Sequence, residues 1–282
     1  MKIMVSGSHG FVGSALLESL KKQGHEVVRL GRDFTKPLDF EGVDAVVHLA
    51  GENIAKGRWN NAKKQRIESS RVDGTSQLAN QIALSKNKPR VIISASAIGF
   101  YGDRGNEELS EESEAGSGFL PEVCVKWENA AQPATDAGVR TVFLRTGIVL
   151  SREGGALKKM LPPFKMGGGG ILGDGKQHMS WISLDDMVGI IEFLIHKGAC
   201  SGAFNLVSPN PVTNHDFTKV LGNVLHRPTI LPLPAFAARL MFGEMADALL
   251  LSSAKVLPKK LLEAGYQFKH PDLKPALEEI LK

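Results

Sequence analysis

Short apolar runs alternate with longer amphipathic stretches over the first 150 residues of the chain. The runs have the length of strands, and their nearly continuous apolar character is typical of parallel strands that are buried on both faces. They occupy residues 3–5, 26–30, 44–51, 89–96 and 139–144. Between them, apolar residues recur at helical spacing in residues 11–22, 59–82 and 119–137. We therefore predict an α/β fold built on a doubly wound parallel sheet.

The regular alternation stops after Leu150, and glycines and prolines punctuate the rest of the chain. Residues 153–176 are crowded with glycines, and the interleaved apolar residues favour a loop-rich lid over a low-complexity linker. Further short elements are predicted at residues 177–182, 184–196, 204–207 and from Thr213 onward. We expect a larger domain from residues 1–150 and roughly 178–200, and a smaller C-terminal lid domain from residues 151–177 and 201–282.

A glycine turn connects the first strand to the first helix. Gly7, Gly10 and Gly13 follow the spacing G-x-x-G-x-x-G rather than the commoner G-x-G-x-x-G. Glycines there permit a tight turn and close approach of a phosphate, and the unpaired N–H groups of the first helical turn attract the anion. Such a turn is often only a turn, but here it lies between a strand and a helix, as dinucleotide binding requires. The expected cofactor contacts are Gly7, Ser8, Gly10, Phe11 and Val12.

The second strand ends in Gly31 and Arg32, where a doubly wound fold meets the adenosine ribose of a dinucleotide. An acidic residue there would accept a bond from a 2′-hydroxyl, whereas Arg32 offers a planar guanidinium suited to a 2′-phosphate. The alternative is a surface arginine beside Asp33. We predict that Gly31 and Arg32 contact the cofactor and that the cofactor is NADP rather than NAD.

Small and hydroxyl-bearing residues end the third and fourth strands. Ala50-Gly51 lets a nucleotide lie close, and we expect His48 to pack in the core rather than act in catalysis. Ser96 ends the fourth strand, where a hydroxyl can bond a substrate oxygen or only cap a turn. Tyr101 in the following loop and His178 near the lid are candidates for the substrate pocket, and packing beneath the lid is an equal alternative for His178.

Charge and composition narrow the classes of partner. The 34 basic and 30 acidic residues give a net charge of +4, without the clustered basic and aromatic residues of a nucleic-acid face. No apolar run has the length of a membrane span or a signal peptide. Cys124 and Cys200 have neither a metal-ligand spacing nor a disulfide framework, so no metal is expected. We expect a cytoplasmic protein with a small-molecule substrate, and the chain is compatible with a homodimer.

Short motifs recur in a fixed order along the whole chain. After the glycine turn come His48-Leu49-Ala50-Gly51, Val72-Asp73-Gly74-Thr75, Ser94-Ala95-Ser96, Leu144-Arg145-Thr146-Gly147, Gly173-Asp174-Gly175 and Ser183-Leu184-Asp185-Asp186-Met187. This order resembles the extended short-chain dehydrogenase/reductase superfamily of sugar-nucleotide epimerases. Further motifs, among them Gly51-Glu52-Asn53-Ile54, Glu68-Ser69-Ser70-Arg71-Val72 and Met179-Ser180-Trp181-Ile182, are similar to its SulA-homologue "epimerase family protein" branch.

The resemblance implies a Rossmann fold that binds NADP(H). It implies cofactor contacts from Arg32, Leu49, Ala50 and Arg71, and we also expect Ser94 to contact the cofactor. From the residues alone, Arg71 in the second helix can either reach a phosphate or be solvated.

One part of the superfamily pattern is missing. Its proton donor is a tyrosine four residues before a lysine, on the helix that should begin at Phe119. Aligning Glu128 with the helix glutamate places Leu120 and Cys124 at these positions, and a different register places Glu122 and Lys126 there. The chain has two tyrosines, and neither is followed by a lysine four residues later.

Two hypotheses follow for the function. The first is an NADP-dependent oxidoreductase or epimerase-like enzyme that keeps Ser96 as a catalytic hydroxyl and binds its substrate beneath the glycine-rich loop. The second is a non-catalytic NADP(H)-binding sensor or regulatory protein. Ser96 and the lid favour the enzyme, and the missing tyrosine and lysine favour the sensor.

Overall fold

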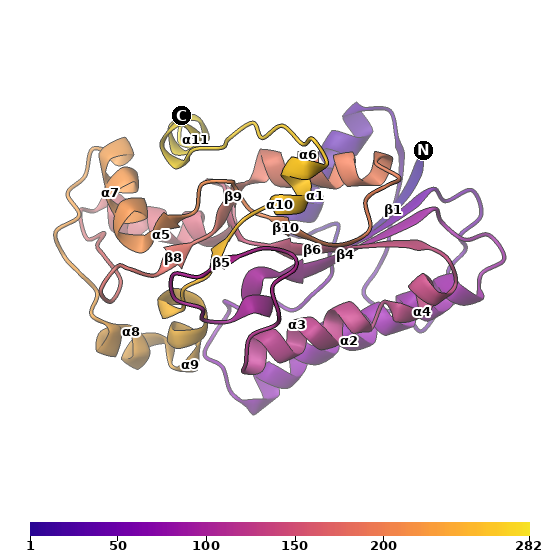
Figure 1. The fold of residues 1–282 in the computed structure, drawn as a ribbon, viewed down its shortest axis with the longest axis horizontal. Coiled ribbons are helices and arrows are strands. Elements are labelled where there is room, and N and C mark those ends of the chain that lie inside the picture. Colours follow the sequence, from indigo (N-terminus) through magenta and orange to yellow (C-terminus); the bar gives the residue numbers. More distant parts are fainter.

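The computed structural model describes residues 1–282 and is built around a six-stranded sheet (Figure 1). Its strand order is β10-β6-β4-β3-β1-β2, and every neighbouring pair is parallel. The strands are β1 (Lys2–Ser6), β2 (Glu26–Arg29), β3 (Ala45–His48), β4 (Val91–Ala97), β6 (Arg140–Thr146) and β10 (Gly202–Leu206). The chain order reverses beside β1, which creates the switch point where such sheets bind ligands at their carboxyl edge. The predicted doubly wound parallel sheet is confirmed.

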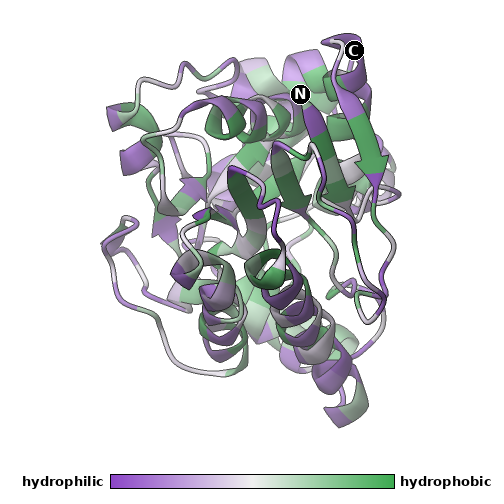
Figure 2. Ribbon diagram, turned by 90° about the vertical axis from the view of Figure 1, so that its right-hand side faces the viewer, coloured by the Kyte–Doolittle hydropathy of each residue, from purple (hydrophilic) through white to green (hydrophobic).

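Helices cover both faces of this sheet (Figure 1). On one face lie α1 (Phe11–Lys22) and α6 (Leu184–His196); on the other lie α2 (Asn61–Leu84), α3 (Phe119–Asn129) and α4 (Gln132–Asp136). Successive residues of a strand point to opposite faces, so Ile3 and Val5 join the α1/α6 core while Met4 joins the α2/α4 core. Figure 2 accordingly shows the sheet strands mainly green and the helices with alternating green and purple segments.

The predicted helix at residues 119–137 is divided into α3 and α4. Pro133 lies in the first turn of α4, where a backbone N–H would have no acceptor within the helix, so proline costs no hydrogen bond there. α2 follows the predicted range closely, and its first turn is capped by the Asn60 side chain, which accepts from the Lys63 N–H at 2.8 Å.

The remaining elements form the lid and its connections to the sheet. The helices are α5 (Gly155–Lys165), α7 (Asn214–Leu225), α8 (Ala235–Phe242), α9 (Glu244–Ala246), α10 (Lys259–Glu263) and α11 (Leu273–Ile280), with the short turns η1 (Ile98–Tyr101) and η2 (Asp247–Leu251). The strand pairs are β5 (Glu108–Leu109) with β12 (Lys255–Val256), β7 (Ile148–Leu150) with β9 (Trp181–Ser183), and β8 (His178–Met179) with β11 (Val212–Thr213). A separate core of residues from α5, α7 and α11 holds the lid together.

Three expectations for the second half of the chain need correction. The glycine-rich stretch is not all loop: α5 forms because Leu157, Leu161 and Phe164 share one buried face, although Pro162 and Pro163 lie within it. The strand predicted at residues 177–182 is split into β8 and β9, which pair in different sheets. β10, placed in the smaller domain by the predicted boundary at residue 201, is the edge strand of the main sheet. No helix has both the length and the apolar composition needed to cross a membrane.

Candidate functional site

The glycine turn lies at the carboxyl edge of the sheet, between β1 and α1. Gly7 has φ +67°, and a Cβ there would lie 2.7 Å from the Leu49 carbonyl carbon. A Cβ at Gly13 would lie 2.2 Å from the Gly7 oxygen. Side chains are therefore excluded because the turn packs directly against the backbone after β3 and against α1.

The N-terminus of α1 has hydrogen-bond donors with no protein partner. Gly10 is its N-cap and provides no side-chain bond, and the first turn contains no acidic residue. No acceptor in the protein takes the N–H groups of Phe11, Val12 or Gly13. With the positive end of the helix dipole, these N–H groups suit an anionic ligand such as a pyrophosphate.

Basic side chains collect where β2 ends beside this turn. Arg32 and Gly31 are exposed there, as the predicted 2′-phosphate site requires. The structure adds Arg29, whose Nη1 lies 3.1 Å from the His9 Nε2 across the turn. Sequence reasoning missed this pair, although the parallel register of β1 and β2 brings Arg29 opposite Val5, close to the glycines.

The end of β3 is fixed by a buried hydrogen bond. Ser6 Oγ lies 2.7 Å from His48 Nδ1 and accepts from the Ala50 N–H at 3.3 Å. His48 has no exposed surface, and burial lowers its pKa to about 4. His48 is thus a neutral core residue, as expected, and it positions Leu49 and Ala50 beneath the glycine turn.

Arg71 reaches from α2 to the same edge of the sheet. Its guanidinium donates to the backbone oxygens of Ile67 at 3.0 Å and Glu52 at 3.1 Å. Its Cζ lies 4.9 Å from the Trp127 ring and faces Gly51, where an added Cβ would approach to 3.3 Å. Burial lowers the pKa of Arg71, and no carboxylate bonds it. Arg71 is therefore a positioned positive charge available to a ligand.

Ser96 belongs to a buried network that the sequence did not indicate. Its hydroxyl donates to Glu128 Oε1 at 2.7 Å, and Arg145 Nε and Nη2 donate to the same carboxylate at 2.9 Å each. The Arg145 Cζ also lies 3.4 Å from the Phe100 ring centroid. Although burial opposes the charge, the hydrogen bonds that Arg145 donates to Glu128, together with the negative charge of that carboxylate, raise the pKa of the Arg145 guanidinium.

Tyr101 belongs to the same network of hydrogen bonds. Its hydroxyl donates to Asn205 Oδ1 at 2.7 Å and accepts from Arg145 Nη1 at 3.1 Å. Tyr101 is fully buried, and burial raises its pKa. It lies beneath the sheet edge rather than in a substrate pocket, which corrects its predicted role in this structure.

The missing proton-donor positions face the end of β4. An added Cβ at Gly99 would lie 3.4 Å from the Leu120 Cβ and 3.9 Å from the Cys124 Sγ. This placement favours the register that puts Leu120 and Cys124 where the superfamily has its tyrosine and lysine. Burial raises the pKa of the Cys124 thiol to about 12, so the thiol stays protonated at neutral pH.

Of the remaining predicted residues, Ser8 is buried in the glycine turn, with its Oγ 3.4 Å from His9 Nδ1, and Ser94 and His178 lie farther away. Ser94 is fully buried, and its hydroxyl lies 3.4 Å from the Ala95 oxygen, facing the core between the sheet and α2. His178 lies on β8, where it lines a cavity of the lid together with residues of α7 and β12.

Polar contacts join the lid to the loop after β3. Lys159 Nζ of α5 donates to the Ala55 oxygen at 2.9 Å, and Arg58 Nη2 donates to the Leu240 oxygen of α8 at 2.5 Å. On the other side of the turn, an added Cβ at Gly154 would lie 2.3 Å from the Phe11 ring. The lid therefore closes over the carboxyl edge of the sheet, where the glycine turn and Arg71 lie.

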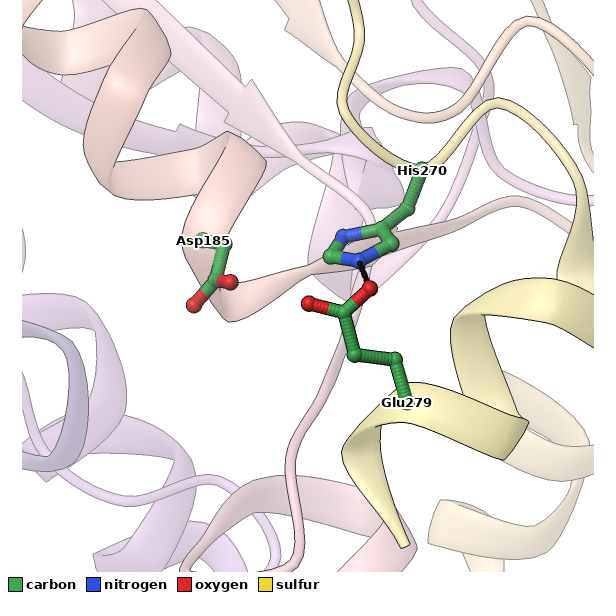
Figure 3. A group of neighbouring side chains, drawn as sticks. All are labelled: Asp185, His270 and Glu279. Atoms are coloured by element: carbon green, nitrogen blue, oxygen red, sulfur yellow. Dashed lines mark ion pairs between the residues drawn. The ribbon is translucent and has the colours of Figure 1, made fainter. Parts of the chain in front are cut away.

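Asp185, His270 and Glu279 form a compact group at the junction of α6 and α11 (Figure 3). Their ligand-type atoms lie within 4.8 Å of one another, and His270 Nε2 lies 3.1 Å from Glu279 Oε2. Lys269 Nζ lies 2.6 Å from Asp185 and 2.7 Å from Glu279. Hydrogen bonds from Lys269 and His270 lower the pKa of Glu279 to about 2. Because a lysine ammonium already bridges both carboxylates, we assign this group to holding α11 against α6.

Comparisons with known proteins agree with this geometry. Residues 3–207 match the NAD dependent epimerase/dehydratase family. The chain belongs to this family. Residues 233–280 match a domain of unknown function, DUF1731, which contains α8 to α11.

Individual relatives cover the whole chain. An "epimerase family protein" of Mycobacterium bovis is 42% identical over 98% of this chain and 96% of its own. The crystal structure of human epimerase family protein SDR39U1 with NADPH is 35% identical, covers 99% of each chain and has a TM-score of 0.94. A structure described as the nucleoside-diphosphate sugar epimerase from Corynebacterium glutamicum is 40% identical, with a TM-score of 0.80 over 100% of this chain and 58% of that one. The predicted membership of the "epimerase family protein" group is confirmed.

Proposed function

We propose that this protein binds NADP(H) along the carboxyl edge of its sheet and uses it in an oxidoreductase or epimerase-like reaction on an unidentified small molecule. The observation that carries the proposal is the α1 N-terminus, where three consecutive N–H groups lack a protein acceptor and the first turn contains no acidic residue. An anionic pyrophosphate supplies the acceptors that this turn lacks. The NADPH in the human relative's structure supports the same assignment.

Different residues around the turn would bind different parts of the cofactor. In this proposal Arg32 bonds the 2′-phosphate, because a guanidinium can bond two phosphate oxygens at once, and Arg29, 3.1 Å from His9, adds positive charge at the end of the same strand. Arg71 presents its charge at Gly51, farther along the edge. The bound nicotinamide would supply hydride transfer, while the protein orients the substrate and excludes water beneath the lid.

Few side chains around Ser96 can donate a proton to a substrate or accept one from it. The Ser96 hydroxyl donates a hydrogen bond to Glu128, so its oxygen can still accept a hydrogen bond from a substrate group. Leu120 has no ionisable group, and the raised pKa of Cys124 keeps it neutral. A carbonyl substrate that accepts a hydride must also gain a proton, and because neither Leu120 nor Cys124 supplies one, that proton would have to come from water or from the substrate itself.

Calorimetric titration with NADPH and NADH tests the proposal. We expect NADPH to bind at least about tenfold more tightly, since a charge-assisted bond to the 2′-phosphate contributes about 1.5–3 kcal/mol. Arg32→Ala should remove most of this preference. Lys86→Ala is the matched control, because Lys86 lies between α2 and β4 at the opposite edge of the sheet. Equal affinities for the two cofactors would contradict the assignment of Arg32.

A non-catalytic NADP(H) sensor is the second candidate, and the neutral Leu120 and Cys124 favour it. The two candidates differ in hydride transfer. If the protein is an enzyme, NADPH deuterated at C4 should transfer its label to a metabolite when the protein is incubated with a cell extract. Stoichiometric binding of NADPH with full retention of the label would favour the sensor.

A further inference from the structure

Exposed apolar side chains gather on one part of the lid. Nine large hydrophobic residues of the chain are exposed, and six of them lie in the lid between residues 166 and 241, each 58% to 79% exposed. The segments that carry them are in contact, because the Gly173 N–H donates to the Leu233 oxygen at 3.0 Å and an added Cβ at Gly167 would lie 3.8 Å from Pro228. We call these six side chains the lid patch: Met166, Ile230, Leu231, Phe236, Leu240 and Met241.

The helix α8 directs its apolar side chains away from the protein. Ala238 is the one buried residue of α8, so the helix packs against the lid through this position. Phe236 and Leu240 each lie two residues from Ala238, a rotation of about 200° in an α-helix, and therefore project from the opposite side. Figure 1 shows α8 together with α5 and α7 at the end of the molecule away from the N-terminus. An apolar surface of this kind on a folded protein commonly marks a site of interaction.

Positive charge surrounds the lid patch. Residues 154–173 and 217–243 contain all six apolar side chains, together with six lysines and arginines and no aspartate or glutamate. Among these six cations only Arg239 is in an ion pair, with Asp247. The others are Lys158, Lys159, Lys165, Lys219 and Arg227. The patch is therefore complementary to a partner that has an anionic surface and an apolar interior.

Two observations favour a lipid bilayer over a protein as this partner. A second copy of the chain, related by a two-fold axis, would place the same patch against itself and bring like charges together. Side chains that project from a surface need matching pockets in a folded partner, whereas a bilayer deforms around them. Anionic headgroups attract nearby lysines and arginines, and exposed phenylalanine and leucine side chains insert at the boundary of the acyl chains.

We propose that the lid patch binds the surface of an anionic lipid bilayer. In this arrangement α8 lies in the plane of the headgroups with Phe236 and Leu240 inserted, and Lys158, Lys165 and Arg227 face the lipid phosphates. The attachment is peripheral, through the lid surface alone. The patch shares no residue with the glycine turn, with Arg71 or with the Ser96 network. Membrane binding therefore stands independently of the proposed redox function and can be measured without cofactor.

Co-sedimentation with lipid vesicles tests the patch. The native protein should bind vesicles of equal parts phosphatidylcholine and phosphatidylglycerol at least about tenfold more tightly than vesicles of pure phosphatidylcholine, since each basic residue near an anionic surface contributes about fivefold. Salt screens these charges, so binding should weaken as the ionic strength rises. Absence of binding to the anionic vesicles at low salt, or equal binding to both kinds of vesicle, would overturn the proposal.

A double variant tests the insertion of the apolar side chains. Phe236→Ser combined with Leu240→Ser should weaken binding to anionic vesicles by at least about tenfold, because two large side chains no longer leave water. Leu84→Ser combined with Leu262→Ser is the matched control, since both leucines are exposed and lie outside the lid patch. Both double variants should keep the native circular dichroism and melting temperature. Unchanged vesicle binding by the Phe236 and Leu240 variant would disprove insertion.

A second double variant tests the charges. Lys158 and Lys165 are exposed, lie two turns apart on the same side of α5 and take part in no ion pair. Replacing both by glutamine should weaken binding to anionic vesicles by about 25-fold, or about fivefold for each. Lys21→Gln combined with Lys86→Gln is the matched control, because these exposed lysines lie outside the lid. Equal losses in the two lysine variants would show attraction by net charge alone and contradict the proposal.

A polarity-sensitive dye provides a local readout. Phe236→Cys can be labelled selectively, because the native Cys124 and Cys200 are buried. The dye emission should shift to shorter wavelength when anionic vesicles are added, while a dye on Leu84→Cys should not respond. An unshifted emission at position 236 would overturn the proposal. Sedimentation without lipid tests the second copy: a native dimer that Phe236→Ser turns into a monomer would identify a subunit contact and also overturn the proposal.

Discussion

Replacing Glu128 by glutamine would leave the Arg145 guanidinium as an uncompensated buried charge. The side chains of Arg145 and Glu128 are only 7% and 11% exposed, and two hydrogen bonds of 2.9 Å join them. Glutamine keeps the shape of the side chain but turns one acceptor into a donor that faces Arg145. Removing one partner of a buried pair costs about 3–5 kcal/mol. Because one acceptor survives, we expect Glu128→Gln to lower the free energy of unfolding by about 3 kcal/mol.

Thermal and urea unfolding of the cofactor-free protein measure this loss. Cofactor is left out because a ligand that binds only the folded state would add its own stabilisation. For a chain of this size, 1 kcal/mol corresponds to a shift of about 2 °C in the melting temperature, so the expected fall is about 6 °C. The urea midpoint should fall in parallel.

Two further variants separate the buried charge from other effects. Glu68→Gln removes an ion pair with Lys126 in which the side chains are 36% and 53% exposed, and should cost less than about 1 kcal/mol. Glu128→Leu combined with Arg145→Met removes both buried charges and should recover part of the loss seen for Glu128→Gln. A loss for Glu128→Gln no larger than that for Glu68→Gln would refute the reasoning.

Three other predictions concern pH, the glycine turn and turnover. Burial lowers the pKa of His48 from 6.5 to about 4, so between these values the unfolded chain binds more protons. Stability should therefore fall by about 3 kcal/mol as pH drops through this window, and urea midpoints should show a shallower slope for His48→Asn; equal slopes would contradict this. Gly10→Glu should abolish NADPH binding while circular dichroism stays native, with Gly10→Gln binding better because it lacks the repelling charge; normal binding by the glutamate variant would disprove the site. NADPH oxidation with UDP-sugars should be slow or absent, because Leu120 and Cys124 supply no proton, and rapid turnover would overturn this expectation.

Local sequence patterns were enough to predict five of the six strands of the sheet and the cofactor turn. Continuous apolar runs identify buried parallel strands because their side chains must be apolar on both faces. The glycines of the turn are equally local, since a Cβ at Gly7 or Gly13 would collide with backbone whatever the rest of the chain does. The same reasoning placed His48 in the core and Arg32 at the end of the second strand.

The tertiary structure alone decided what surrounds these elements. Ser96 and Glu128 come together because α3 packs beside β4, and neither residue's partner can be read from its sequence neighbours. Tyr101 was expected near a substrate, but the packing of β5, β10 and η1 buries it and gives its hydroxyl to Asn205 and Arg145. The sequence by itself determined that a dinucleotide fits at the edge of the sheet, because strands, turns and helix ends depend on neighbouring residues. Only the tertiary structure decided which charges are paired there, such as Glu128 with Arg145, and which, such as Arg71, bond no carboxylate, because ion pairs depend on distances between segments far apart in the chain.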